Sequence, residues 1–155
     1  MEQNQQNQQE NANDTLEDYI NKHQTKWSEL ISEMNIKLKN FYDIPELQNI
    51  VYSERQNALD YYFGLLTKVA SISKRYKKEY AEKYNAYKTT SQIRYSSDTA
   101  INAQVASDLC DLVYYSELLS NHAKYMQETI KTIDGIIYAI NSRIEVEKLV
   151  RDYKK

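Results

Sequence analysis

The apolar positions between Val105 and Ile144 follow one another in alternating steps of three and four residues. On a heptad they occupy positions a and d, and only Ser116 interrupts them. The series consists of Val105, Leu109, Leu112, Leu119, Ala123, Met126, Ile130, Ile133, Ile137, Ile140 and Ile144. A stripe this narrow is typical of a helix that packs along another helix, and isoleucine at both a and d favours three or more strands. The pattern therefore predicts one long helix, from about Thr99 to about Asp152, that serves as an oligomerisation element.

Two further helices are expected before this one. Asp14 or Thr15 is suited to cap the first helix, and Trp27 is a packing anchor on its apolar face. A break at residues 42–46 precedes a second long helix that ends near Tyr87. Along this second helix the apolar positions change from aliphatic side chains to tyrosine, which a uniform core helix would not need.

The composition indicates an all-α protein. Two glycines and one proline in 155 residues are far fewer than an architecture of strands and turns requires. No apolar run approaches the roughly 18 residues of a membrane span, and the N-terminus lacks the pattern of a signal peptide. We expect three helices. The chain would divide into a disordered Gln/Asn-rich tail at 1–13, an N-terminal helical region at 14–98 and a long C-terminal helix at 99–155.

The motifs of metal-dependent and nucleotide-dependent enzymes are missing from the sequence. Two glycines cannot form a phosphate-binding loop, and HExxH, CxxC and EF-hand patterns do not occur. We interpret His23 as a core histidine. Cys110, beside Asp108 and Asp111, is interpreted as a small buried residue rather than a nucleophile. We therefore expect no catalysis, no metal and no cofactor, and a single cysteine fits a reducing cytoplasm.

Basic residues gather in the second half of the second helix. Residues 68–95 carry eight bases and two acids, a balance of +6, against −6 for residues 1–67 and −2 for residues 96–155. The candidate binding residues in this block are Lys74, Arg75, Lys77, Lys78, Lys83, Tyr84, Tyr87, Lys88 and Arg94. Basic side chains bind phosphates regardless of sequence, and tyrosine rings stack on unpaired bases. The block is thus a candidate nucleic-acid site, and the alternative is a solvated lysine-rich helix whose tyrosines complete the core.

The order of these segments resembles the UvsY-type recombination mediator proteins of T4-like phages. The order is an acidic first segment, a long helix that turns basic, a polar joint, and a long C-terminal helix with an aromatic-rich start. The similar stretches are residues 16–18, 47–48, 57–66, 83–88, 93–97 and 115–144. The resemblance covers roughly residues 15–150 and leaves the Gln/Asn-rich tail outside.

The resemblance implies a ring-like homo-oligomer that assembles through the C-terminal helix. The oligomer contacts would be Leu119, Met126, Ile130, Ile133, Ile137, Ile140 and Ile144. It also implies single-stranded-DNA binding by Lys83, Lys88 and Arg94. One departure is Thr90, which stands where the family has a second base after a lysine. Either Arg94 substitutes for that base, or the site has moved to the reserve candidates Lys74, Arg75, Lys77 and Lys78.

We therefore expect a homo-oligomeric, single-stranded-DNA-binding recombination mediator without catalytic activity. Its partners would be single-stranded DNA, a RecA-like recombinase and single-strand-binding protein, with no membrane. Its location would be the cytoplasm, that of the host if the chain is phage-encoded. The rival is a coiled-coil scaffold or virion assembly adaptor that does not bind nucleic acid. A strong salt dependence of DNA binding would separate the two, because phosphate contacts release counterions.

Overall fold

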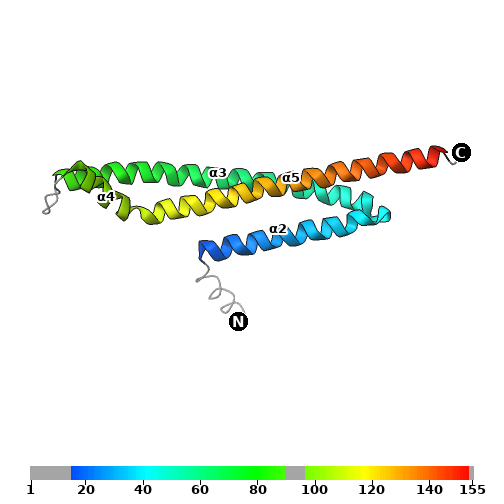
Figure 1. Cartoon of the computed structure of the whole chain (residues 1–155), viewed down its shortest axis with the longest axis horizontal. Coiled ribbons are helices and arrows are strands. Elements are labelled where there is room, and N and C mark those ends of the chain that lie inside the picture. The colour runs from blue at the N-terminus through cyan, green and yellow to red at the C-terminus, as the bar shows by residue number, and fades with distance from the viewer. Residues whose placement is uncertain (1–14, 90–96, 154–155) are drawn as a thin grey trace, which may run out of the picture. The chain divides into compact units, whose positions relative to one another are not determined.

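The computed structural model describes residues 15–89 and 97–153, and the elements within them are all helical (Figure 1). They are α2 (Leu16–Lys39), the 3₁₀-helix η1 (Phe41–Asp43), α3 (Ile44–Thr89), α4 (Asp98–Asp108) and α5 (Cys110–Tyr153). The all-α prediction is confirmed. The predicted number of three helices is wrong, because a break at Leu109 divides the expected C-terminal helix into α4 and α5. The tail predicted at residues 1–13 lies outside the described residues.

The break at Leu109 arises from packing, since neither glycine nor proline is present there. Leu109 has φ −108° and ψ 9°, in the bridge region between helix and strand. Its side chain is 2% exposed and forms one apolar cluster with Ile101 and Val105. Backbone hydrogen bonds continue across the break, from Leu109 N to the Val105 oxygen at 3.1 Å and from Val113 N to the Leu109 oxygen at 3.2 Å. The break is therefore a kink that lets α4 lay its apolar side chains against α3.

Local sequence explains the ends of the first two helices. Thr15 caps α2 as expected: its hydroxyl accepts from Asp18 N at 3.2 Å, and the Asp18 carboxylate accepts from Thr15 N at 3.1 Å. Asn40 then accepts from Tyr42 N and starts η1. Pro45 is tolerated in the first turn of α3, where its missing N–H has no intrahelical partner.

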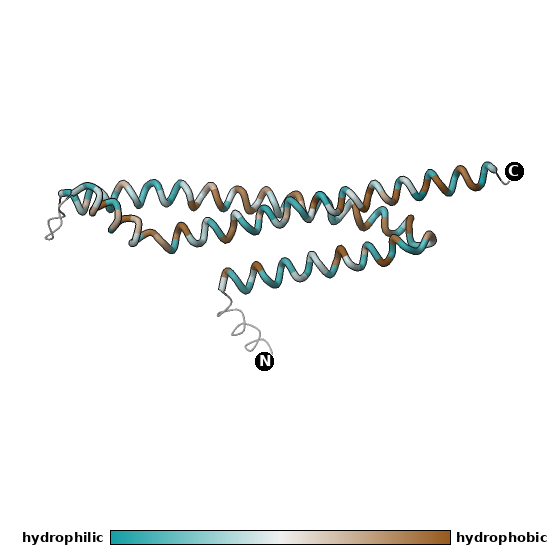
Figure 2. The backbone as a smooth tube through the Cα atoms, viewed as in Figure 1, coloured by the Kyte–Doolittle hydropathy of each residue, from teal (hydrophilic) through white to brown (hydrophobic). Residues whose placement is uncertain are grey.

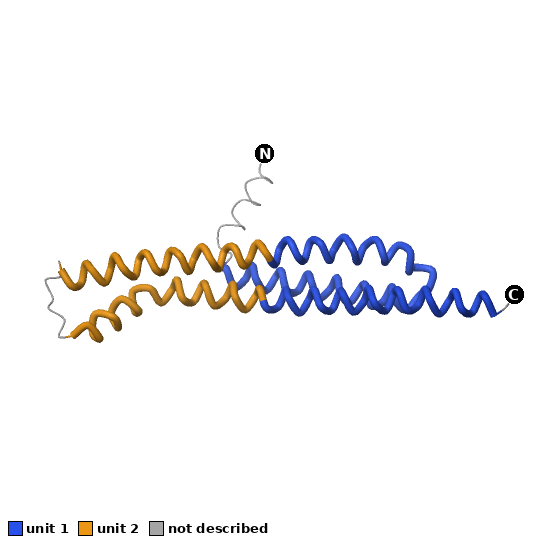
Figure 3. The backbone as a smooth tube through the Cα atoms, turned by 90° about the horizontal axis from the view of Figure 1, so that it is seen from above, with its two compact units in different colours: residues 1–62, 124–155 blue, residues 63–123 orange. Residues whose placement is uncertain are grey.

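The chain forms two compact units, and α3 and α5 contribute to both (Figure 3). The first unit contains α2, η1, α3 as far as Tyr62, and α5 from Lys124 onward. The second unit contains α3 from Phe63, α4, and α5 as far as Ala123.

The first unit is a bundle of three helices around an aliphatic core. α2 and α5 run in the same direction, because the Tyr125 hydroxyl donates to the Gln24 carbonyl at 2.9 Å while Arg143 donates to the Leu38 carbonyl further along both helices. Trp27 is buried, as expected of a packing anchor. The other buried apolar side chains are Ile20, Met34, Ile44, Leu47, Val51, Ala58, Met126, Ile130, Ile133, Ile136 and Ile140.

Much of the heptad series predicted for oligomer contacts packs within the single chain. Leu119, Met126, Ile130, Ile133 and Ile140 are buried, and Ile137 and Ile144 are half-buried. The series does pack along other helices, as its pattern predicts, and those helices belong to the same chain. A contact of these residues with a second subunit stays a prediction.

Apolar positions are distributed among polar ones along the helices (Figure 2). Within the described residues, no helix is both long enough and apolar enough to cross a membrane.

Candidate nucleic-acid interface

The tyrosines of the basic block face α4. Tyr76, Tyr80, Tyr84 and Tyr87 are half-buried and pack against the apolar cluster of Ile101, Val105 and Leu109. The rings of Tyr80 and Tyr84 lie nearly parallel, with centroids 6.4 Å apart. The sequence left two interpretations of these tyrosines open, stacking on bases or completing the core. Their packing supports the second. Tyr84 and Tyr87 therefore present only part of their rings to an incoming base.

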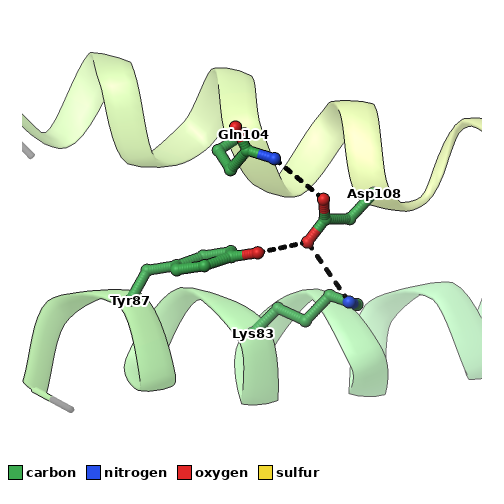
Figure 4. Close-up of polar contacts among 4 residues, drawn as sticks. All are labelled: Lys83, Tyr87, Gln104 and Asp108. Atoms are coloured by element: carbon green, nitrogen blue, oxygen red, sulfur yellow. Dashed lines mark hydrogen bonds and ion pairs between the residues drawn. The ribbon is translucent and has the colours of Figure 1, made fainter. Parts of the chain in front are cut away.

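Asp108, at the end of α4, accepts hydrogen bonds from residues of both α3 and α4 (Figure 4). Its carboxylate accepts from the Tyr87 hydroxyl at 2.5 Å, from Gln104 Nε2 at 2.9 Å and from Lys83 Nζ at 3.2 Å. These hydrogen bonds, led by that of Tyr87, hold the pKa of Asp108 below its ordinary value. Lys83 is thus engaged in holding α4 on α3.

Lys88 also meets an acid of α4, but its contact is more exposed. Its Nζ lies 3.5 Å from Asp98 and 5.5 Å from the centroid of the Tyr84 ring. The hydrogen bond with Tyr84 and the charge of Asp98 raise the pKa of Lys88. The side chains of Lys88 and Asp98 remain 53% and 66% exposed, so water competes with this pair.

Arg75 and Lys78 form ion pairs along α3 itself. Arg75 Nε lies 2.6 Å from Glu79, and Lys78 Nζ lies 3.7 Å from Glu82. Both are (i, i+4) pairs on the helix surface, a class of contact worth about 0.3–0.5 kcal/mol.

Lys74 and Lys77 differ from the other candidates. Both are exposed, and neither forms an ion pair within residues 15–89 and 97–153. At 3.6 residues per turn they fall on the same third of the α3 surface as Lys78 and Lys88. We call these four residues, Lys74, Lys77, Lys78 and Lys88, the lysine stripe. The structure thus divides the predicted basic residues of α3 into the lysine stripe, Lys83 in contact with α4, and Arg75, which pairs with Glu79 outside the stripe.

Sequence reasoning missed the acids of α4. No sequence motif marks Asp98 or Asp108. The same is true of Asn102, also in α4, which accepts a hydrogen bond from the Tyr80 hydroxyl at 2.7 Å. Their only signal is position, since a helix that returns along α3 after a short joint must meet the basic block. Arg94, the remaining predicted contact, lies outside the described residues.

No family model matches the chain, and neither a curated protein nor a solved structure shows significant similarity to it. Over the described part of the chain, no three histidine, cysteine or acidic side chains lie close enough together to hold a metal ion.

Proposed function

We propose that this chain binds single-stranded DNA along the lysine stripe of α3. The observation that carries the proposal is the exposure of Lys74 and Lys77 without an ion-pair partner in the described structure. Their charges are available to phosphates without breaking any recorded contact. Lys74 and Lys88 lie 14 positions apart, which corresponds to about 21 Å along a helix, long enough to follow several nucleotides of an extended strand.

The paired lysines of the stripe can join this contact at small cost. The Lys78–Glu82 and Lys88–Asp98 pairs are exposed on both sides, and exposed pairs of this kind contribute 0 to about 1 kcal/mol. A phosphate offers each lysine a comparable partner and also releases counterions from the DNA. Lys83 is a weaker candidate, because its partner Asp108 is also held by Tyr87 and Gln104.

A few lysines give weak binding, so the proposal includes self-association of the chain. The last turns of α5 extend past the α2–α3 turn within the first unit (Figures 1 and 3). They expose Val146, Leu149, Val150 and Tyr153, which follow one another at helical spacing. A homo-oligomer, ring-like as the resemblance implies, would present several lysine stripes to one strand and bind it by avidity.

The mediator role follows from the same proposal. An extended strand held by several subunits could be transferred to a RecA-like recombinase while single-strand-binding protein is displaced. What supports this step is the order of segments shared with UvsY-type proteins. We place this activity in the cytoplasm, where the exposed lone Cys110 would stay reduced. Recombinase filament assembly on DNA coated with single-strand-binding protein, with and without this chain, tests the role.

The DNA site is tested by fluorescence anisotropy of a labelled single-stranded oligonucleotide at several salt concentrations. The double variant Lys74→Glu/Lys77→Glu should weaken binding at least about tenfold and lower the salt slope by about 1.4, at about 0.7 per phosphate contact. Lys68→Glu/Lys124→Glu is the matched control, because both lysines are exposed, lie outside the lysine stripe and the apolar end of α5, and have no ion pair with a described residue. Equal effects of the two variants would remove the lysine stripe from the proposal.

A scaffold or virion assembly adaptor is the second candidate, and the exposed apolar end of α5 favours it. Sedimentation of Leu149→Asp/Val150→Asp tests this surface, since charges there should dissociate an oligomer built on it. If the chain forms an oligomer through α5 and does not bind DNA even at low salt, the scaffold is supported over the mediator.

A further inference from the structure

Within the second unit, α4 covers one face of α3. Its apolar cluster packs against four tyrosines of α3: Tyr76, Tyr80, Tyr84 and Tyr87. We call these four residues the tyrosine row. They follow one another in steps of four, four and three residues, so they share a face of the helix. All four are half-buried, because α4 covers part of each ring.

The tyrosine row is an aromatic surface that suits unpaired bases. The ring centroids of Tyr76 and Tyr80 lie 5.9 Å apart, and those of Tyr80 and Tyr84 lie 6.4 Å apart with planes 12° apart. Bases of single strands stack on aromatic side chains whatever the sequence, since every base has a π-face. A helix packed on α3 needs apolar area there, which aliphatic side chains also supply, as they do in the first unit. The contact with α4 therefore does not require the π-faces of the row.

The acids of α4 occupy lysines that a strand of DNA would use. The eleven residues of α4 contain two acids and no base. Asp108 accepts from Lys83 Nζ at 3.2 Å and from the Tyr87 hydroxyl at 2.5 Å (Figure 4). Asp98 lies 3.5 Å from Lys88 Nζ. Since α4 brings carboxylates to the lysines and covers the rings, α4 and a single strand compete for the same face of α3.

The contacts that hold α4 on α3 are few. An isolated helix of 11 residues is marginal in water, so α4 depends on its packing. That packing consists of three buried aliphatic side chains, the half-buried tyrosines, and ion pairs that stay partly exposed to water. At Leu109 the backbone leaves helical geometry, which gives α4 a joint about which it can turn.

We propose that the tyrosine row is a base-stacking site that α4 covers in the unbound chain. Single-stranded DNA would turn α4 away at Leu109, so that unpaired bases stack on the row while Lys83 and Lys88 exchange their carboxylate partners for phosphates. The inference rests on the proposed DNA binding and extends it. The lysine stripe makes the first contact, and the row adds affinity for strands with unpaired bases. Double-stranded DNA offers no free base faces and leaves α4 in place.

The cover is tested with Ile101→Ser/Val105→Ser, which weakens the apolar contact of α4 without adding charge. This variant should bind a labelled single-stranded oligonucleotide at least about fivefold more tightly than the wild type, because apparent affinity rises with the fraction of open chains. On an abasic strand of equal length the gain should be smaller, since phosphates are present without bases to stack. Leu66→Ser/Val113→Ser is the matched control: it removes two partly exposed aliphatic side chains of the same unit outside the cluster and should bind as the wild type does.

A second variant holds α4 closed and keeps the test valid if the first one does not fold. In Lys83→Cys/Asp108→Cys, made together with Cys110→Ser, a cleavable bismaleimide can join α3 to α4, because the native side chains meet at 3.2 Å. The linked chain should bind the oligonucleotide at least about fivefold more weakly than the same chain after the linker is cleaved.

Four outcomes separate this proposal from the proposed function. Unchanged affinity of a folded Ile101→Ser/Val105→Ser chain, an equal gain on the abasic strand, or unchanged affinity on cleavage of the linker would each overturn the cover. If Lys74→Glu/Lys77→Glu weakens binding in the same assays, the lysine stripe then stands without it. A tighter Ile101→Ser/Val105→Ser chain with no effect of Lys74→Glu/Lys77→Glu would keep the cover and remove the stripe. Absence of binding by every variant at low salt would overturn both.

Discussion

The two units of this chain hold their helices together in different ways. In the first unit the buried side chains are mostly aliphatic, apart from Trp27, and side chains such as Val51 and Ile133 are completely covered. In the second unit the cluster that holds α4 contains three aliphatic side chains and is completed by tyrosines that stay half-buried. A tyrosine contact leaves part of each ring, and the hydroxyl, near water. We infer that α4 separates from α3 at a lower free energy than the one that unfolds the first unit.

The largest expected effect is that of a charge in each core. Ile133→Asp should abolish folding of the first unit, because burying an unpaired carboxylate costs several kcal/mol and a domain of this size is stable by about 5–15 kcal/mol. Val105→Asp should release α4 and keep most of the helix content. Circular dichroism and hydrogen exchange measure both. Equal loss of structure in the two variants would contradict the difference between the units.

The contact of α4 should depend on pH through Asp108. The pKa of this carboxyl is lowered in the folded chain, so its contribution is present above the ordinary value of 3.8 and is lost as the pH falls through the lower, folded value. Amide protection in α4 should therefore persist from neutral pH down to that range and then decline. In Tyr87→Phe the decline should begin at a higher pH. If amide protection in α4 declines with the same midpoint pH in Asp108→Asn as in the wild type, a group other than Asp108 causes the pH dependence.

A smaller effect is expected from the acid that covers the end of the lysine stripe. Asp98→Asn removes a competitor of phosphate at Lys88 and should tighten single-stranded-DNA binding by up to about fivefold, since exposed ion pairs contribute at most about 1 kcal/mol. Asp134→Asn, which removes an ion pair with Arg55 in the first unit, is the control and should leave DNA binding unchanged. Looser binding in Asp98→Asn would show that α4 must stay in place for DNA to bind.

The smallest effects concern the two glycines, one in each unit. A Cβ at Gly64 or Gly135 would have no atom within 4 Å, and both positions lie inside long helices. Alanine at either site should raise the free energy of unfolding by about 0.5–1 kcal/mol. Trp27 and Gly135 both lie in the first unit, so urea denaturation followed by Trp27 fluorescence should report the whole stabilisation from Gly135→Ala. A larger stabilisation from Gly64→Ala would reverse the inferred order of stability of the two units.

Local signals in the sequence predicted the helix ends well. The Thr15 cap, the break before Pro45 and the anchor Trp27 could all be predicted, because each depends on a few neighbouring residues and their hydrogen-bonding or packing needs. The heptad series predicted most of the residues that α5 buries, but it missed a further row of buried side chains, His122, Thr129 and Ile136, so the buried face is wider than predicted. It could not predict which chain supplies the neighbouring helix, because a three–four spacing is the same for contacts within and between chains.

The kink at Leu109 and the contacts of the basic block could not be predicted from local patterns. Leu109 continues the heptad series, so nothing in its spacing marks the break. Lysine and tyrosine at helical spacing describe a solvated face, a nucleic-acid site and a core edge equally well. The difference lies in Asp98 and Asp108, which come from α4 and become relevant only once that helix is placed against α3.

The kink at Leu109 also gives the chain a natural site for a reporter. The next residue, Cys110, is the only cysteine in the sequence, and it is exposed, so the prediction that it is buried is wrong. A thiol-reactive spin label or dye would attach at this one position without removing any other residue, and Lys74 and Lys77 would remain unmodified. The label would sit at the joint between α4 and α5. Its relaxation in stopped-flow mixing with DNA would give the rate at which α4 leaves and returns, a time constant rather than an equilibrium.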